Sequence, residues 1–315
     1  MLLTAMQSLI SFFATVALAI LPQLVFSEEA PTHPVKPLLW KIEGKGLSKP
    51  SYLFGTIHLG SGPLAKLHPA AEAAFEQSDV LYTEIPFDQK TQLGATRLLL
   101  RNDQKTLVQS IGEKLKNRLD KELAAINPQL DSEPFQFLKT WAVAATLPML
   151  KAQIGGEQAM DGTLWQRAEA EEKKTDSIET VESQLGVFDA FNEEEQIIML
   201  SETLKMMKED RLAKKDSMQE LIDAYVTGDL QSLQKTLDKS LDEMRKGEHK
   251  ELGERFYKKL LTDRDASMAE VIVKKLANSP GDCHFFAAGA AHFAGDKSIR
   301  AHLEKAGYKI TRIEK

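Results

Sequence analysis

The sequence predicts an α/β fold in which a mixed central sheet, built from both ends of the chain, is flanked by helices and interrupted by a large helical insert. Three observations predict this fold. Strand-like runs occur near both ends of the chain, within residues 38–86 and 283–314. Short helical segments alternate with these runs, as is typical of α/β sheets. Between them, at about residues 91–278, apolar residues recur mostly at helical spacing.

The first part of the folded chain is predicted to contain a β-hairpin, a helix and a third strand. Strand-like runs at residues 38–44 and 51–58 are separated by the turn-rich sequence KGLSKP, which favours a hairpin. The sequence LHPAAEAAFEQS then predicts a helix, with Pro69 in the first turn, where its missing N–H costs nothing. A strand follows at residues 79–86, and Glu84 lies near its carboxyl end.

The middle of the chain is predicted to be mostly helical. Apolar residues keep helical spacing from about Thr91 to Ala170, with breaks at prolines and at a glycine pair. Residues 173–180 are predicted to add one strand. A long helical stretch, rich in charge, then covers residues 191–230, and a further pair of helices covers about residues 230–278.

The end of the chain repeats the opening plan. A strand at residues 283–290 follows the turn NSPGD, and a helix from about Asp296 to Lys305 is ended by Gly307. The last strand covers residues 308–314. A sheet made from both ends, with helices inserted between them, would place the similar strand ends side by side.

The N-terminal residues are apolar and contain no charged side chain before Glu28. This pattern predicts a secretory signal peptide over residues 1–27, cut after Ser27, and therefore a periplasmic or secreted protein. The alternative is an uncleaved membrane anchor, because a membrane span needs about 20 apolar residues. Residues 28–37 are predicted to be a flexible lead-in, and residues 38–315 a single domain.

Composition excludes several classes of function. The formal net charge of −6 arises from acids and bases mixed along the chain, so no basic stripe for nucleic acid is present. Cys283 is the single cysteine, which excludes an internal disulfide. The sequence has no cysteine cluster for zinc, no CxxCH motif for haem, no glycine-rich phosphate loop and no GxSxG nucleophile motif. The chemistry must therefore come from other groups.

Two distant segments share one pattern, in which an apolar run is followed by a glycine and then, three positions later, by a histidine. Gly55 and His58 form the first pair, and Gly289 and His292 the second. Ligands of open α/β sheets collect beyond the carboxyl ends of the strands. A glycine before the histidine lets the backbone turn out of the strand or approach another group closely. We therefore expect both imidazoles to be presented in one crevice, together with the strand-end Glu84.

Two imidazoles and one carboxylate are a familiar ligand set for a catalytic divalent metal ion. His58, Glu84 and His292 are therefore the predicted metal ligands. Such an ion would lower the pKa of a bound water from about 16 towards about 7 and make hydrolysis feasible without a nucleophilic side chain. The alternative is that each histidine is an ordinary hydrogen-bonded residue at the end of a strand.

Several segments together resemble the TraB/GumN family, which groups with the Tiki proteins among erythromycin-esterase-like and ChaN-like folds. They are LWKIEGKGLSKPSYLFGTIHLG, DVLYTEIP, AMDGTLWQRAEAEEKKTDSIETVESQLGVFDAF and FFAAGAAHFAGDKSIRAHLEKAGYKITRI. The resemblance implies an exported metal-dependent hydrolase of the metallopeptidase type, acting on a peptide or protein substrate. It also implies a divalent metal, manganese or cobalt, with zinc as an alternative.

The resemblance also implies roles for other polar residues. Glu179 and Glu182 match an acidic segment and are candidates for a general base or for a carboxylate that orients a histidine. The alternative is that acids simply favour a helix N-terminus there. Arg264 could anchor a carboxylate or stabilise an oxyanion, or it could form a structural ion pair. Asp265 replaces the usual asparagine, and Asp161 either matches an acidic position or caps a helix.

Two other functions stay open on the sequence. The chain could bind haem or a metal ion without turnover, because ChaN-like relatives bind haem, and Tyr52, Tyr82 or a histidine could be axial ligands. It could also be a regulatory binding module with a vestigial site. A membrane contact is expected only through residues 1–27 if they are retained, and the sequence predicts no oligomeric state.

Overall fold

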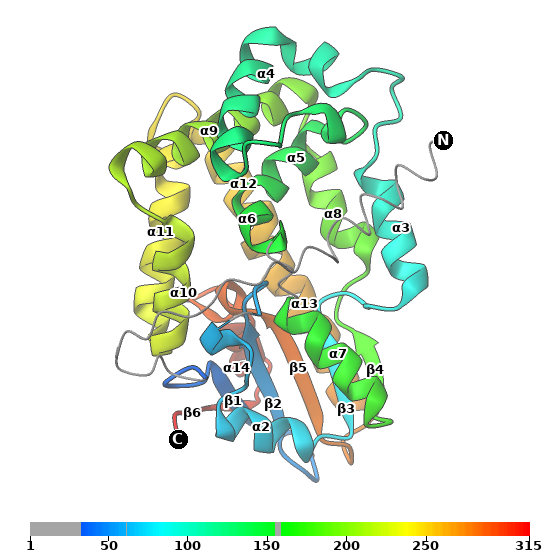
Figure 1. Cartoon of the computed structure of the whole chain (residues 1–315). Helices are drawn as coiled ribbons and strands as arrows, with labels where there is room; N and C mark the ends of the chain where they lie inside the picture. Colours follow the sequence, from blue (N-terminus) through cyan, green and yellow to red (C-terminus); the bar gives the residue numbers. More distant parts are fainter. Residues whose placement is uncertain (1–32, 61, 155–158) are drawn as a thin grey trace. The chain divides into compact units, whose positions relative to one another are not determined.

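A computed structural model describes residues 33–60, 62–154 and 159–315. The predicted signal peptide and residues 28–32 of the predicted lead-in lie outside the described residues. The chain forms two compact units, drawn in Figure 1. A helical unit contains residues 99–154 and 191–215, and a sheet unit contains the rest of the described chain. None of the helices in the described ranges is both long and apolar enough to cross a membrane.

The sheet unit is built on a mixed sheet, which in the described residues has six strands in the order β4-β3-β5-β2-β1-β6. The strands are β1 (Leu39–Glu43), β2 (Ser51–Thr56), β3 (Val80–Thr83), β4 (Lys174–Ser177), β5 (His284–Gly289) and β6 (Lys309–Ile313). Five of these come from the two ends of the chain, and β4 is the strand predicted at residues 173–180. The predicted fold class is therefore confirmed.

The topology brings the two Gly-x-x-His segments together. Strand β5 lies between β2 and β3 and runs parallel to both of them. The register pairs Thr56 with Gly289, so β2 and β5 end at the same level. Strand β3 ends one residue before Glu84 and at the same edge of the sheet. The predicted hairpin of β1 and β2 is also present, with β6 antiparallel to β1 on its other side.

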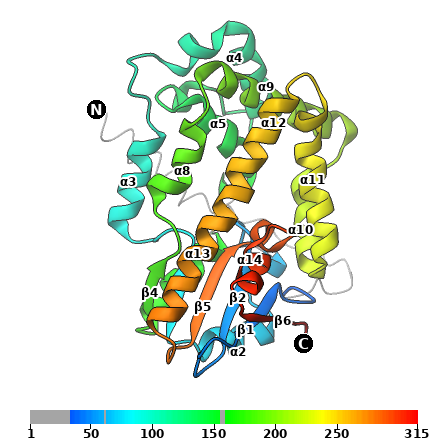
Figure 2. The same cartoon turned by 180° about the vertical axis from the view of Figure 1, so that it is seen from behind.

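Helices cover both faces of the sheet. Figure 1 shows α2 and α7 on one face, and Figure 2 shows α13 and α14 on the other. The core between them is apolar and includes the fully buried rings of Phe75, Phe285 and Phe286. The helices assigned to this unit are α2 (Pro69–Glu76), α3 (Gln89–Leu99), α7 (Met160–Ala170), α8 (Val181–Asp189), α10 (Ser217–Thr227), α11 (Leu230–Lys246), α12 (Lys250–Tyr257), α13 (Asp263–Asn278) and α14 (Ile299–Lys305).

The helical unit has its own apolar core. It contains α4 (Leu107–Ile126), α5 (Thr140–Thr146), α6 (Leu150–Ile154) and α9 (Glu193–Ala213). Leu119 and Leu123 of α4 are fully buried in the same cluster as Leu200 of α9. Arg101 donates to Glu193 over 2.7 Å and to Thr140 over 3.3 Å, so polar contacts also tie this unit together. The helical spacing predicted for these residues is confirmed.

Several predicted boundaries are wrong, and the chain shows why. The predicted helix over residues 191–230 is two helices, because Lys214 adopts a left-handed backbone (φ 53°) and Asp216 caps the next helix through Gln219 N–H. The last helix begins at Ile299 rather than near Asp296, because Ser298 provides its cap. The predicted pair over residues 230–278 is α11, α12 and α13, with a π-helical turn at Lys258–Thr262 joining the last two.

Gly55 lies in close contact with the segment that carries the second histidine. A Cβ at this position would lie 3.0 Å from Leu38 Cβ and 3.2 Å from Ala290 Cα. The Gly55 N–H donates to Leu38 O over 2.7 Å, and the Gly55 carbonyl accepts from the Tyr225 hydroxyl over 2.7 Å. The backbone of Gly55 is therefore fixed by hydrogen bonds at its N–H and at its carbonyl, and it has no room for a side chain.

Replacing this glycine by alanine is expected to destabilise the protein by about 1–3 kcal/mol, because the new methyl group meets backbone and Cβ atoms that cannot rotate away. Urea unfolding of Gly55→Ala measures the loss. Gly94→Ala is the matched control, since a Cβ at Gly94 in α3 meets nothing within 4 Å. That control should be neutral or slightly stabilising, because alanine favours a helix by about 1 kcal/mol over glycine. Equal stability of the two variants would contradict the expected crowding.

Candidate functional site

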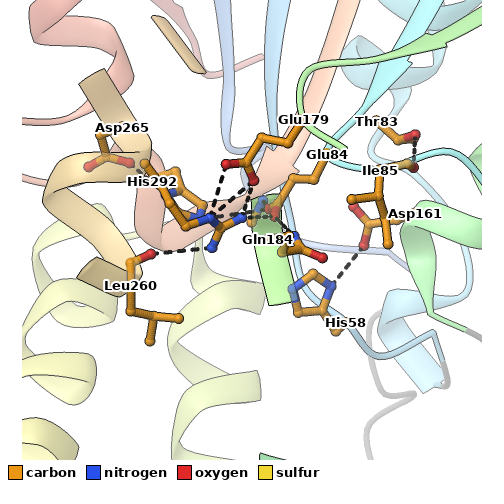
Figure 3. Close-up of polar contacts among 12 residues, drawn as sticks. His58, Thr83, Glu84, Ile85, Asp161, Glu179, Gln184, Leu260, Asp265 and His292 are labelled. Carbon is orange, nitrogen blue, oxygen red and sulfur yellow. Dashed lines mark hydrogen bonds and ion pairs between the residues drawn. The ribbon is translucent and has the colours of Figure 1, made fainter. Parts of the chain in front are cut away.

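Three of the predicted site residues meet beyond the carboxyl ends of adjacent strands. His58 follows β2, Glu84 follows β3, and His292 lies in the short 3-10 turn Ala290–Phe293 that follows β5. An ideal Cβ built on Gly289 would lie 3.1 Å from Glu84 Oε1, 3.6 Å from His292 Cδ2 and 3.8 Å from His58 Nε2. Figure 3 shows the three side chains converging there. Because Gly289 has no side chain, it does not fill the space between these three side chains.

Each histidine is held through Nδ1 by an aspartate. His292 Nδ1 lies 2.5 Å from Asp265 Oδ1, and His58 Nδ1 lies 3.2 Å from Asp161 Oδ2 (Figure 3). Asp161 is itself fixed, because Thr56 Oγ1 donates to its other oxygen over 2.7 Å. A proton on Nδ1 that is donated to a carboxylate leaves Nε2 with the free lone pair. On His292 that atom lies 3.8 Å from Glu84 Oε1.

Glu84 is buried and accepts hydrogen bonds at both oxygens. Oε1 accepts the Gly289 N–H over 2.6 Å. Oε2 accepts Nη2 of Arg264 and Nε2 of Gln184, each over 2.6 Å. Burial raises the pKa of this carboxyl, but the electrostatic interactions with His292 and with the guanidinium of Arg264 outweigh burial and lower the pKa to about 2. Glu84 is therefore ionised at neutral pH.

Arg264 of α13 connects Glu84 to Glu179 inside the protein. Its Nη2 donates to Glu179 Oε2 over 2.6 Å, and its Nε donates to the same oxygen over 3.0 Å. Its Nη1 donates to the carbonyl of Leu260 over 3.2 Å, in the π-helical turn. Burial lowers the pKa of this guanidinium, but Glu84 and Glu179 outweigh burial, so the net effect is a raised pKa. All three nitrogens are thus bound to the protein itself, as in an ion pair with a structural role.

His58 is the exposed member of the site. Its side chain is 59% exposed, whereas those of Glu84 and His292 are 5% and 4% exposed. Partial loss of hydration around the ring lowers the pKa of His58, but the hydrogen bond to Asp161 and the charges of Asp161 and Glu84 outweigh it and raise the pKa to about 9. Burial raises the pKa of Asp265, the partner of His292, even though its interaction with His292 lowers that pKa. Because the side chain of His58 is exposed, solvent reaches the site on the side of His58.

The structure separates the remaining predicted residues. Glu179 is buried against Arg264, whereas Glu182, in the first turn of α8, is exposed. The side chain of α8 that reaches Glu84 is Gln184, which the sequence analysis did not single out. Asp161 does not cap α7, which begins at Met160 after Ala159 and has no side-chain cap. It binds His58 instead. No feature of the sequence distinguished Gln184 from its neighbours.

The donor set fits a divalent metal ion, although the described residues contain no group of three His, Cys, Asp or Glu side chains already arranged to hold one. Two imidazoles oriented by carboxylates, beside an ionised glutamate, are the chemistry that such ions take. The 3.8 Å between His292 Nε2 and Glu84 Oε1 is near the separation of about 3.4 Å between two tetrahedral ligands. Of the three predicted ligands, the exposed His58 has the most room to adjust its side chain.

Comparison with known proteins agrees with the resemblance seen in the sequence. Similar proteins include the "Metalloprotease TIKI homolog" of Nematostella vectensis, 23% identical over 91% of this chain and 69% of the relative. "Metalloprotease TIKI1" of Xenopus tropicalis and of Homo sapiens are each 25% identical over 86% of this chain, which spans 60% and 61% of their lengths. No solved structure matches the chain. Residues 38–312 match the family model described as "TraB/PrgY/gumN family", and the chain belongs to that family.

Proposed function

We propose that this protein is a metal-dependent hydrolase that cleaves peptide bonds, with His58, Glu84 and His292 as the ligands of one divalent ion. The observation that carries the proposal is the convergence of these three side chains on the space beside Gly289. The names of the similar proteins, which are metalloproteases, support a peptide or protein substrate. Manganese or cobalt is the proposed metal, with zinc as an alternative.

When bound, such an ion would polarise a carbonyl and lower the pKa of a water molecule. Asp161 and Asp265 each accept the Nδ1 proton of a histidine and so orient the ring with Nε2 as the atom that would bind the ion. Arg264 keeps Glu84 ionised by placing a positive charge beside it. The exposed edge of His58 gives a substrate its access from solvent.

The two predicted acid–base residues have different surroundings. The carboxylate of Glu179 is taken up by Arg264, so we propose that Glu179 holds the guanidinium against Glu84 rather than receiving a proton. Glu182 lies exposed on α8, on the opposite side of the helix from Gln184, so its carboxylate faces away from Glu84 and we propose no proton transfer through it.

Haem binding is less well supported. Tyr52 and Tyr82 are each 6% exposed within the sheet. Burial raises the pKa of Tyr82 to about 12 and also raises that of Tyr52. A tyrosine that binds haem iron does so as an accessible phenolate. Neither tyrosine offers an accessible phenolate. A histidine ligand such as the exposed His58 is compatible with haem.

The proposal predicts peptide cleavage that depends on added metal. Protein stripped with a chelator is expected to cleave no peptide in a defined peptide mixture, and Mn²⁺ or Co²⁺ should restore cleavage. Mass spectrometry of the products measures both results. Undiminished cleavage by metal-free protein would contradict the proposal. A Soret band after incubation with haem, with no metal-dependent cleavage, would favour the haem-binding alternative.

A further inference from the structure

We infer that Gln184 is a positioning residue that leaves Glu84 one free lone pair, on Oε1, so that Glu84 binds the metal through that oxygen alone. This inference rests on the proposed function, because it concerns the same site. It adds a residue from α8 to a site whose other members come from the strand ends, α7 and α13.

The hydrogen bonds to Glu84 divide its two oxygens into different roles. A carboxylate has about four lone-pair sites, two on each oxygen. Oε2 accepts from both Arg264 and Gln184 at 2.6 Å, so its capacity is filled. Within the described residues, Oε1 accepts a hydrogen bond from the Gly289 N–H alone, at 2.6 Å. The remaining lone pair is on the oxygen that lies 3.8 Å from His292 Nε2.

Backbone contacts fix the place of Gln184 relative to Glu84. The N–H of Ile178 donates to the carbonyl of Thr83 over 2.9 Å, and the N–H of Glu179 donates to the carbonyl of Glu84 over 2.7 Å. Thr180 then caps α8 by accepting from the Ser183 N–H over 3.1 Å. The start of α8 is therefore held in register with the end of β3, and Gln184 is placed within reach of Glu84.

A neutral donor suits this position. Glu84 already has a buried cation, Arg264, on the same oxygen. A second cation there would hold the carboxylate equally well but would repel a bound metal ion, since charges in a buried site are poorly screened. The amide of Gln184 donates to Oε2 without adding charge. The residue thus fixes the orientation of Glu84 while leaving the site attractive to a cation.

The test is titration of the full chain with Co²⁺, followed by calorimetry and by the visible d–d absorption of the bound ion. Gln184→Met keeps the length of the side chain but removes the donor. It is expected to weaken Co²⁺ binding by about 10- to 100-fold, as is typical when a group that orients a ligand is lost. The d–d band should also change intensity, because the freed oxygen changes the coordination. Ser183→Ala, an exposed neighbour on the same helix, should bind and absorb as the wild type does.

A second variant guards against a loss of folding. Gln184→Leu also removes the donor and adds no charge, so it should weaken Co²⁺ binding by a similar factor. Circular dichroism of both variants checks the fold. Wild-type affinity and spectrum in both variants would overturn the inference while leaving the proposed function intact. A wild-type protein that binds no Co²⁺ would instead overturn the proposed function.

Discussion

Replacing either His58 or His292 by asparagine is expected to abolish stoichiometric uptake of Mn²⁺ or Co²⁺ while leaving the fold intact. An asparagine amide can still donate to Asp161 or Asp265 from roughly the place of Nδ1, but it has no counterpart of Nε2. Loss of a residue that only orients a ligand weakens binding by about 10- to 100-fold, so loss of the ligand itself should exceed about 100-fold.

Elemental analysis after gel filtration, together with calorimetric titration, measures this loss. His249→Asn is the control, because His249 lies at the start of α12 and has no part in the proposed site. Circular dichroism should show an unchanged fold for both variants. The His58 variant should be the less perturbed of the two, because the His58 side chain is 59% exposed. If either ligand variant retains one ion per chain with wild-type affinity, the assignment of that histidine is wrong.

Replacing Arg264 by methionine is expected to lower the free energy of unfolding by about 3–5 kcal/mol, because it leaves two buried carboxylates without their partner. Glu84 and Glu179 are 4% and 7% exposed, so solvent cannot replace the guanidinium. Arg167→Met is the matched control, since Arg167 also pairs with two glutamates, Glu72 and Glu171, but at the surface. The control should cost about 1 kcal/mol or less.

The effect of Arg264→Met should depend on pH. The pKa of Glu84 is about 2 in the folded protein, compared with an ordinary value of 4.5. A lowered pKa contributes stability that is present above pH 4.5 and is lost as the pH falls towards 2. The difference in unfolding free energy between wild type and variant should therefore be largest near neutral pH and shrink over that window. Denaturant unfolding at several pH values tests this, and a difference that does not shrink on acidification would argue against the ion pair.

Local patterns in the sequence predicted the fold class and the three proposed ligands. The strands around His58, Glu84 and His292 are short apolar runs ended by glycine or proline, and such runs are defined by neighbouring residues alone. Parallel strands ending at one edge then bring distant residues together by a general rule of α/β sheets. The convergence on Gly289 agrees with that reasoning.

Helix rotation decided which residue of α8 reaches the site. Glu182 and Gln184 are two positions apart, so they point about 200° apart around a helix of 3.6 residues per turn. The sequence marked Glu182 as chemically suitable, but the backbone bonds of Ile178 and Glu179 to the end of β3 place α8 so that Gln184 reaches Glu84. A one-dimensional pattern cannot fix that rotation, because it depends on the packing of both faces of the helix.

The sequence by itself determined the strands, their ends and the types of polar side chain placed there, because these depend on short-range backbone preferences and on the chemistry of single side chains. Only the tertiary structure decided that Asp161 pairs with His58, that Asp265 pairs with His292 and that Arg264 is bound between two glutamates. Each of these pairs joins residues on separate elements, from 27 to 180 positions apart. Their choice depends on buried charges finding partners in three dimensions, which no local pattern records.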